Sequence, residues 1–437
     1  MSSITLKRIL SRPNMTKAYQ QVVGNQGAAG IDQMQCEELD DHLQKHWSEI
    51  KLKIESGKYQ PQALRRVLIP KPQGGTRQLG IPTVLDRLLQ QSIAQEISNH
   101  YEPHFSNSSY GFRPGRSCHQ AIDQALVYLN AGYEYVVVID ISKFFDKVNH
   151  DQLMYSLSKE ISDKQVLKLI RKYLQSGVME NGVKHPTEEG TPQGGNLSPV
   201  LSNIVLDRLD KELEKRGHRF VRYADDISIY VKSNRAGLRV LESVQTWIEE
   251  SLQLSVNESK SGVFKYHKLE ILGFGFYKNS KQIATRITKG SYARFKRKLK
   301  SLTNRSKSQS HRERLRKLNQ VTTGWLAYFS KADGRKRITQ LDEWLRRRLR
   351  CCIWKQWKRV KTRMRNLQKL GVAKWQAYQW ANTRKGYWRI SGSPIIQTTI
   401  TKERLNKSGY KSLLKTYDRF HENLSNRRGT RTVCQVV

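Results

Sequence analysis

Three aspartates are the residues of this chain whose type and spacing best suit metal-dependent chemistry. Asp225 and Asp226 are adjacent in the stretch 220–230, FVRYADDISIY, and Asp140 directly follows the apolar run 135–139. A carboxylate at the end of a buried strand costs free energy unless it is paired or bound to a cation. The three residues are therefore the first candidates for a functional site.

The stretch around the aspartate pair predicts a β-hairpin with two carboxylates at its tip. Apolar Ile227, Ile229 and Val231 alternate with Ser228 and Tyr230, the period of two that is typical of a strand. Adjacent aspartates are also common in ordinary turns. This stretch alone leaves open both an ordinary turn and an active site.

A shared sheet would bring all three carboxylates together. The β-branched run Val136–Ile139 predicts a central strand covered on both faces. If the hairpin is its neighbour, repulsion among the carboxylates would raise at least one pKa unless a divalent metal is present. Oxygen ligands favour Mg²⁺. Two Mg²⁺ ions about 3.5–4 Å apart serve in-line phosphoryl transfer in polymerases.

A basic hairpin offers a second element of such a site. The segment 63–82, ALRRVLIPKPQGGTRQLGIP, predicts two strands around the turn 72–75, with Lys71 and Arg77 on either side. Lysine and arginine above glycine-permitted backbone suit a polyphosphate. By itself, the segment is equally consistent with a solvated basic hairpin.

Apolar residues at helical spacing predict the helices that hold these strands. They occur in the segments 38–55, 82–97, 197–206 and 238–252. The glycine turn Pro192–Gly195 precedes the third of these helices. Such a turn exposes backbone, which favours an anion or a flat partner.

The charge of the chain points to nucleic acid. Residues 281–437 hold 42 Lys and Arg against 7 Asp and Glu, which is +35 of the net +40. This field causes self-repulsion unless a polyanion neutralises it. Segments such as 341–360 place apolar residues on one helical face and basic residues on the other. A basic structural protein would share this charge, and an anionic membrane ranks lower because no strong amphipathic anchor accompanies it.

Several classes of protein are disfavoured. No run of about 18 apolar residues is available to span a membrane, and residues 1–14 lack the apolar core of a secretion signal. The five cysteines show no C-x-x-C spacing, so we expect reduced thiols rather than a zinc site or disulfides. We therefore expect a cytoplasmic protein that does not engage membranes.

In its ordered motifs, the chain resembles the group II intron-encoded reverse transcriptases and maturases. The motifs are Lys71 with Arg77, DISKFFD at 140–146, TPQGGNLSP at 191–199, YADD at 223–226, NESKS at 257–261 and ILGF at 271–274. GAAGID at 27–32 resembles the family's extra N-terminal loop, and SYGFRPGRS at 109–117 resembles its insertion between finger motifs. GWLAYF at 324–329 and the segment 341–358 resemble its maturase domain.

The resemblance implies an α+β fold of the right-hand polymerase type. Fingers and palm would occupy residues 1–285, with an extension loop at 24–32 and an antiparallel palm sheet flanked by helices. An all-helical, basic thumb or maturase domain would follow at 286–370, and a basic DNA-binding region at 371–437.

The resemblance also implies roles for individual residues. Asp140 and Asp225 would be the main metal ligands, with the Ile141 carbonyl as a backbone ligand, Asp226 assisting, and Lys260 donating a proton to pyrophosphate. The nucleotide would be bound by Lys71, Arg77, Phe145, Gln193, Gly194 and Ala224, of which Phe145 would exclude a ribose 2′-hydroxyl and Ala224 would lie beneath the primer end. Nucleic-acid contacts are expected from Arg113, Arg116, Arg346, Arg347, Arg348, Lys355, Lys358 and Arg359.

The implied function is RNA-directed DNA synthesis with two Mg²⁺ ions and dNTPs, coupled to binding and splicing of a host intron RNA. The implied partners are that intron, an RNA template with a DNA primer, a DNA target and a second copy of the chain. The implied location is the bacterial cytoplasm, and the nucleoid when the protein is bound to DNA. Many members of the family carry a C-terminal endonuclease, and its histidine and cysteine pattern is not seen before CQVV, so we expect no second-strand cleavage. Two alternatives remain: a splicing cofactor with dispensable polymerase activity, and a polymerase recruited for repair in the host.

Overall fold

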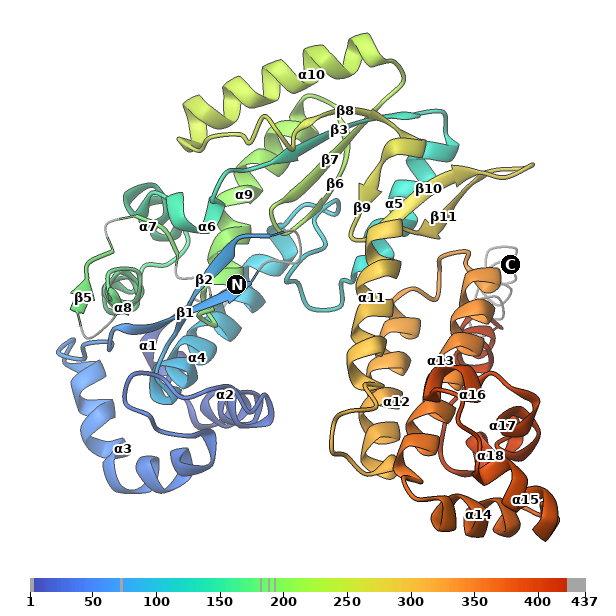
Figure 1. Ribbon diagram of the computed structural model, residues 1–437. Helices are drawn as coiled ribbons and strands as arrows, with labels where there is room; N and C mark the ends of the chain where they lie inside the picture. Colours follow the sequence, from blue (N-terminus) through green and yellow to red (C-terminus); the bar gives the residue numbers. More distant parts are fainter. Residues whose placement is uncertain (1–3, 71–73, 181–182, 188, 192–193, 423–437) are drawn as a thin grey trace, which may run out of the picture. The chain divides into compact units, whose positions relative to one another are not determined.

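The computed structural model describes residues 4–422 except 71–73, 181–182, 188 and 192–193. The chain divides into two compact units, residues 1–266 and 267–437. Each unit is described by itself. Figure 1 shows strands gathered in the first unit and a helical bundle following a small sheet in the second.

An antiparallel sheet forms the centre of the first unit. Its strands are β6 (Arg219–Tyr223), β7 (Asp226–Val231), β3 (Tyr135–Asp140) and β8 (Gly262–Lys265), in the order β6-β7-β3-β8. Each neighbouring pair is antiparallel. The prediction that the aspartate hairpin lies beside the strand ending in Asp140 is therefore confirmed.

Helices cover this sheet because its strands are apolar on both faces. Val137 and its partner Ile229 on one face, and Val136 and its partner Tyr230 on the other, are at most 2% exposed. Full burial of one such side chain contributes about 1.5–3 kcal/mol. Helix α10 (Asn234–Trp247) packs against β3 and β8, and α9 (Ser198–Lys215) packs against β6 (Figure 1).

A second sheet holds the predicted basic hairpin. Strands β1 (Leu64–Pro70) and β2 (Thr76–Ile81) pair antiparallel, and β4 (Val178–Glu180) and β5 (Val183–His185) extend the sheet in the order β2-β1-β4-β5. Helix α4 (Val84–Tyr101) follows, and its N-cap Thr83 accepts a hydrogen bond from the Asp86 amide. The other helices of this unit are α1 (Leu6–Ile9), α2 (Arg12–Gly24), α3 (Leu39–Glu55), α5 (Cys118–Asn130), α6 (Phe144–Lys147), α7 (His150–Ser158) and α8 (Lys164–Leu174).

The second unit begins with a three-stranded sheet. Strands β9 (Glu270–Ile271), β10 (Phe274–Lys278) and β11 (Ile283–Ile287) lie in the order β11-β10-β9. The motif ILGF at 271–274 runs from the end of β9 into the start of β10, and these two strands pair antiparallel. The chain turns between them, where Leu272 and Gly273 have φ of 51° and 80°.

Helices make up the rest of the second unit. They are α11 (Lys289–Leu302), α12 (His311–Tyr328), α13 (Arg335–Gln356), α14 (Val360–Lys369), α15 (Lys374–Ala381), α16 (Tyr387–Ser391), α17 (Pro394–Thr399) and α18 (Lys402–Lys407). The compact units separate after Tyr266, because β9, β10 and β11 pair with one another and not with the strands of the first unit. The boundary at residue 285 that the resemblance implies between palm and thumb stays a prediction.

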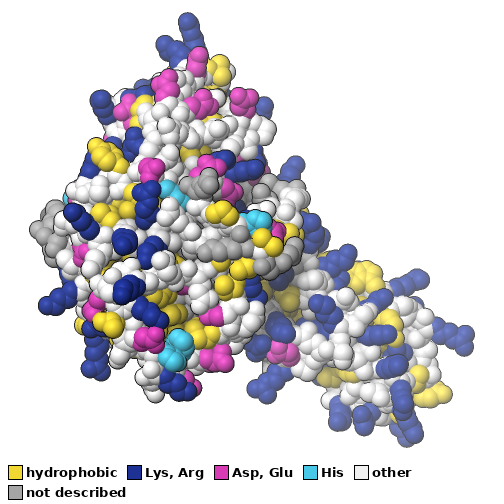
Figure 2. All heavy atoms as spheres, turned by 90° about the vertical axis from the view of Figure 1, so that its left-hand side faces the viewer, with side chains coloured by type: hydrophobic (Ala, Val, Ile, Leu, Met, Phe, Trp, Pro, Cys, Tyr) yellow, Lys and Arg dark blue, Asp and Glu magenta, His cyan; other side chains and the backbone are white. Residues whose placement is uncertain are grey.

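The surface carries the charge that the sequence predicted. Lys and Arg side chains stand out across the face drawn in Figure 2, with fewer Asp and Glu among them. Among the helices that the structure describes, none combines the length and apolar character needed to cross a membrane.

Candidate functional site

The three aspartates meet at one end of the central sheet. Asp140, the last residue of β3, lies opposite Asp226, the first residue of β7. Directly opposed residues of an antiparallel pair project from the same face. Asp225 precedes Asp226 in the turn that joins β6 to β7. The structure thus brings the three carboxylates together, and their role as metal ligands stays a prediction.

The electrostatics of this cluster call for a cation. The Asp226 residue is exposed, but the surrounding protein takes water away from its carboxylate, which disfavours the charged form. Repulsion from Asp225 and Asp140 disfavours the charged form further. Together they raise the pKa of Asp226 to about 6. Burial also raises the pKa of Asp225, repulsion from Asp140 adds to it, and Arg77 opposes the rise. Arg77 of β2 therefore lies near enough to Asp225 to act on it electrostatically, and its contact with a triphosphate stays a prediction.

The donor atoms suit a hard divalent ion. Within the described part of the chain, no group of three or more His, Cys, Asp or Glu side chains is arranged as a ready metal site. Asp140, Asp225 and Asp226 nevertheless offer carboxylate oxygens, the type of ligand that Mg²⁺ binds. The cluster therefore fits Mg²⁺ by chemistry and by charge.

The backbone after β3 presents a carbonyl oxygen toward the aspartate hairpin, and its role as a metal ligand stays a prediction. The Ser142 amide donates to the Ser255 carbonyl and the Asn257 amide donates to the Asp140 carbonyl, both at 2.8 Å. These two bonds flank Ile141, so its own amide and carbonyl face the opposite edge of the strand, which is the edge beside β7. The Ile141 carbonyl therefore faces the side on which the aspartate hairpin lies.

Lys260 lies at the same site. Its Nζ is 3.4 Å from Oδ2 of Asp140, and the Ser261 hydroxyl accepts a hydrogen bond from the Asp140 amide at 3.0 Å. The Lys260 side chain is 60% exposed, so this ion pair is weak. The structure places Lys260 beside the predicted metal ligands, and its proton-donor role stays a prediction.

Gly190 and Thr191, which directly precede the glycine turn, pack against the short helix α6 and the residue that follows it. The Thr191 amide donates to the Phe145 carbonyl at 2.6 Å, and the Gly190 amide donates to the Val148 carbonyl at 2.7 Å. A Cβ at Gly190 would lie 2.8 Å from the Phe145 carbonyl oxygen. The Phe145 ring is partly buried beside Phe144, with centroids 5.2 Å apart. These contacts fix the position of Phe145.

The other predicted nucleotide contacts are partly described. Gly194 has φ of 118°, and a Cβ there would lie 2.6 Å from the carbonyl oxygen of Gly80 in β2. The close approach links the glycine turn to the strand that carries Arg77. Lys71 and Gln193 lie outside the described residues.

The turn at the aspartate hairpin is unusually tight. Ala224 has φ of 57°, in the left-handed region that few non-glycine residues adopt. A Cβ at Gly111 would lie 2.2 Å from the Ala224 nitrogen. The Tyr110 amide donates to the Arg222 carbonyl at 2.9 Å. The backbone of the loop 109–117 therefore packs against the backbone of this turn and supports it.

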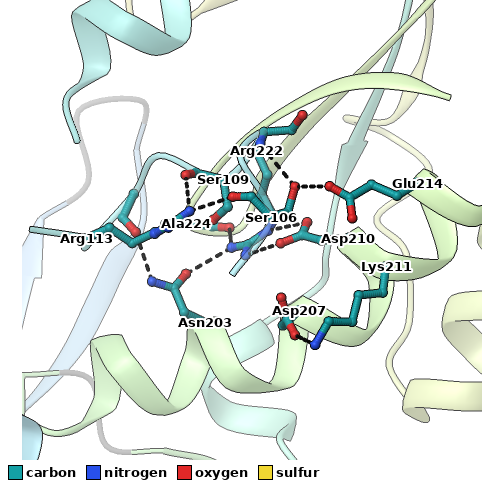
Figure 3. A network of polar contacts seen from close by, with 12 residues as sticks. Ser106, Ser109, Arg113, Asn203, Asp207, Asp210, Lys211, Glu214, Arg222 and Ala224 are labelled. Carbon is teal, nitrogen blue, oxygen red and sulfur yellow. Dashed lines mark hydrogen bonds and ion pairs between the residues drawn. The ribbon is translucent and has the colours of Figure 1, made fainter. Parts of the chain in front are cut away.

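A buried ion pair that sequence reasoning missed also holds this turn (Figure 3). Arg222 and Asp210 are both 0% exposed at their side chains and are joined by two hydrogen bonds of 2.7 and 2.5 Å. The Arg222 guanidinium also donates to Asn203 Oδ1 and to the Ala224 carbonyl, both at 3.0 Å. One signal was available: an arginine inside the otherwise apolar strand FVRY.

Arg113 has an internal role in the structure. Its guanidinium donates to the Glu102 carboxylate and to the carbonyls of Ser106 and Ser109, and the residue is only 7% exposed. This placement favours a structural role over the predicted contact with nucleic acid. Arg116 donates to Asn107 Oδ1 at 2.7 Å and remains partly exposed.

The arginine run of α13 is also engaged within the protein. Arg346 pairs with Asp342, Arg347 donates to the Trp388 carbonyl at 3.1 Å, and Arg348 donates to Thr303 Oγ1 at 2.6 Å. The Lys355 ammonium lies 4.8 Å from the centroid of the Tyr387 ring. Lys358 and Arg359 are exposed between α13 and α14. Contacts of these residues with RNA or DNA stay predictions.

Comparison with known proteins agrees with this geometry. Residues 69–276 match the family described as "Reverse transcriptase (RNA-dependent DNA polymerase)". Residues 292–371 match "Group II intron, maturase-specific domain". Protein YkfC of Escherichia coli (strain K12) is 31% identical over 299 residues, which cover 59% of this chain and 78% of YkfC. The chain belongs to the group II intron family of reverse transcriptases.

Other similarities are less complete. The group II intron-encoded protein LtrA of Lactococcus lactis subsp. cremoris is 30% identical over 367 residues. The aligned region covers 65% of this chain and only 60% of LtrA. A chain of the solved "Partial Cas6-RT-Cas1--Cas2 complex" is 24% identical to this reverse transcriptase, with a TM-score of 0.36. The superposed region covers 55% of this chain and 42% of the chain in the complex.

The reverse transcriptase should gain stability when Asp226 loses its charge. The folded pKa of about 6 lies above the ordinary 3.8, so ionisation destabilises the folded state above pH 6 and has no such effect below pH 3.8. Asp226→Asn should therefore raise the free energy of unfolding of protein in EDTA at pH 8 by about 1 kcal/mol after solvent screening, and the Tm should rise with it. Calorimetry at pH 8 and pH 4.5 measures this, and the gain should shrink at pH 4.5.

Asp151→Asn is the matched control, since Asp151 is exposed on α7 and pairs with Arg171. An equal Tm for Asp226→Asn and wild type at pH 8 would show that ionisation of Asp226 does not destabilise the folded state.

Proposed function

We propose that this reverse transcriptase extends a DNA primer on an RNA template at Asp140, Asp225 and Asp226. The observation that carries the proposal is the register of the central sheet, which sets Asp140 opposite Asp226 with Asp225 adjacent. In this reaction the primer 3′-oxygen attacks the α-phosphorus of a dNTP. The bond to the β-phosphate oxygen breaks, pyrophosphate leaves, and the hydroxyl proton passes to solvent.

The protein's part is to hold the reactants. Two Mg²⁺ ions, when bound, would lower the pKa of the 3′-hydroxyl and neutralise the triphosphate. Asp140 and Asp225 would hold them, with help from Asp226 and the Ile141 carbonyl. Arg77 would bind the triphosphate, and Lys260 would give a proton to the departing pyrophosphate.

Residues around this centre would shape the nucleotide pocket. Lys71 would join Arg77 on the triphosphate, while Gln193 and Gly194 would line the pocket beside the sugar and base. Ala224 is buried at the hairpin turn, so we infer that it supports the primer end through its backbone and its small side chain.

We further propose that the partner RNA is a group II intron that this chain helps to fold and splice. The match of residues 292–371 to the maturase-specific domain and the +35 charge of residues 281–437 support this. We expect affinity for the intron to fall steeply with salt. A DNA target, a second copy of the chain and a location in the bacterial cytoplasm and at the nucleoid belong to the same proposal.

A primer-extension assay tests the polymerase proposal. Wild-type protein with an oligo(dT)-primed RNA, dNTPs and Mg²⁺ should produce cDNA, and EDTA should abolish it. The absence of product from wild-type protein that still binds intron RNA would instead favour the splicing cofactor with dispensable polymerase activity.

Replacing Phe145 should relax the choice of sugar. Phe145→Val removes the ring that we expect to collide with a ribose 2′-hydroxyl, so incorporation of rNTPs relative to dNTPs should rise about 10-fold or more. Steady-state kcat/KM for dTTP and UTP on one template measures the ratio. Tyr155→Val, at an exposed tyrosine of α7, is the matched control. An unchanged ratio would remove Phe145 from this role.

A further inference from the structure

A hollow in the second unit is built from tryptophan and basic side chains. It measures about 440 Å³, and its lining includes Lys296, Arg297, Lys300, Trp344, Arg348 and Trp388. These residues come from three helices: α11, α13 and α16. Two adjoining hollows also include Trp388 in their lining. Trp388 therefore lies where the three hollows meet.

Trp388 is held in place before any ligand binds. The Arg347 guanidinium lies 4.1 Å from the centroid of the Trp388 ring and donates to the Trp388 carbonyl at 3.1 Å. Arg347 is itself confined, because a Cβ at Gly392 would lie 2.7 Å from its Cζ atom. The indole remains 39% exposed. A large aromatic side chain that is exposed but fixed loses little entropy when a ligand stacks on it.

The second tryptophan of the lining, Trp344, also lies beside basic side chains. Lys296 and Arg348 lie 5.3 and 5.2 Å from the centroid of the Trp344 ring. Among the described residues that line the hollow, four are basic and none is acidic. The hollow therefore combines apolar aromatic walls with positive charge.

We propose that this hollow binds one unpaired nucleotide of a structured RNA, with the base against Trp388. Stacking on aromatic side chains and neutralisation of phosphate by lysine and arginine are the two interactions that single-stranded nucleotides use. A base inside a duplex is stacked on both of its faces and so cannot enter. The proposal rests on the proposed binding of RNA and specifies which feature of that RNA is recognised.

The experiment compares two RNA hairpins that differ by one bulged adenosine. Anisotropy with the full chain should show tighter binding of the bulged hairpin, by about 5- to 150-fold, the range expected for one stacked base. Trp388→Ala should abolish this preference, whereas Trp388→Phe should keep most of it. Trp375→Ala is the matched control, because Trp375 is a 71% exposed tryptophan on α15 outside the lining.

Several outcomes would overturn the proposal. Equal wild-type affinity for the two hairpins, or an intact preference in Trp388→Ala, would remove the nucleotide site. An equal preference for a bulge in a DNA hairpin would overturn the assignment to RNA. Failure of the proposed function is distinct, since wild-type protein would then bind neither hairpin at low salt and would extend no primer.

Discussion

Asp225→Asn is expected to slow nucleotide addition by about 10³-fold or more. The substitution keeps the shape of the side chain but removes the charge that would hold a metal ion. Loss of metal-based stabilisation of the transition state costs several kcal/mol, and about 4 kcal/mol corresponds to 10³ in rate. Asp140→Asn should have an effect of the same order. Single-turnover rapid-quench measurement of one dTTP addition gives the rate directly.

The control for this prediction is Asp151→Asn, a substitution of the same chemistry at an exposed position of α7. Its rate should equal that of wild type. Both variants should melt within a few degrees of wild type, because Asp225 lies in a turn and not in the core. A rate for Asp225→Asn within tenfold of wild type would show that the carboxylate is not a metal ligand in the reaction.

Asp210→Ala is expected to destabilise the first unit by about 3–5 kcal/mol. The substitution leaves the guanidinium of Arg222 fully buried and without its carboxylate, and breaking a buried ion pair on one side carries a cost of this order. Chemical denaturation followed by tryptophan fluorescence measures the loss. Asp207→Ala is the control, since Asp207 pairs with the exposed Lys211 on the same helix.

A double substitution separates stability from positioning at this pair. Arg222→Met with Asp210→Leu removes both charges and should recover much of the stability lost by Asp210→Ala. It cannot restore the hydrogen bond from Arg222 to the Ala224 carbonyl. We therefore expect nucleotide addition to remain slow in the double variant. A wild-type rate would show that Arg222 stabilises the fold without positioning the aspartate turn.

The parts of the site that local patterns encode were predictable from sequence. Alternation through 227–231 and the β-branched run ending at Asp140 predicted two strands, and both exist. Their adjacency required the further assumption of a shared sheet, which the register of β3 and β7 confirms. The family resemblance supplied the order of motifs, and the family matches agree with it.

The support of the hairpin turn could not be predicted, because it depends on contacts between distant segments. Arg222 meets Asp210 across 12 positions, and Asn203 donates to the Gly111 carbonyl across 92. The positive φ of Ala224 has no local signal either, since alanine rarely adopts it. The resemblance also placed Arg113 among the nucleic-acid contacts, whereas the structure buries Arg113 and engages it with Glu102, which no local pattern indicates.

Metal-directed cleavage tests the central claim most directly, namely that Asp140 and the aspartate turn form one metal site. Fe²⁺ in place of Mg²⁺, with ascorbate and peroxide, produces hydroxyl radicals that cut the backbone near the bound ion. The account predicts cuts close to residues 140–141 and 224–226 in wild-type protein, suppressed by excess Mg²⁺ and absent from Asp225→Asn. Cuts confined to other segments, or an unchanged pattern in Asp225→Asn, would contradict it.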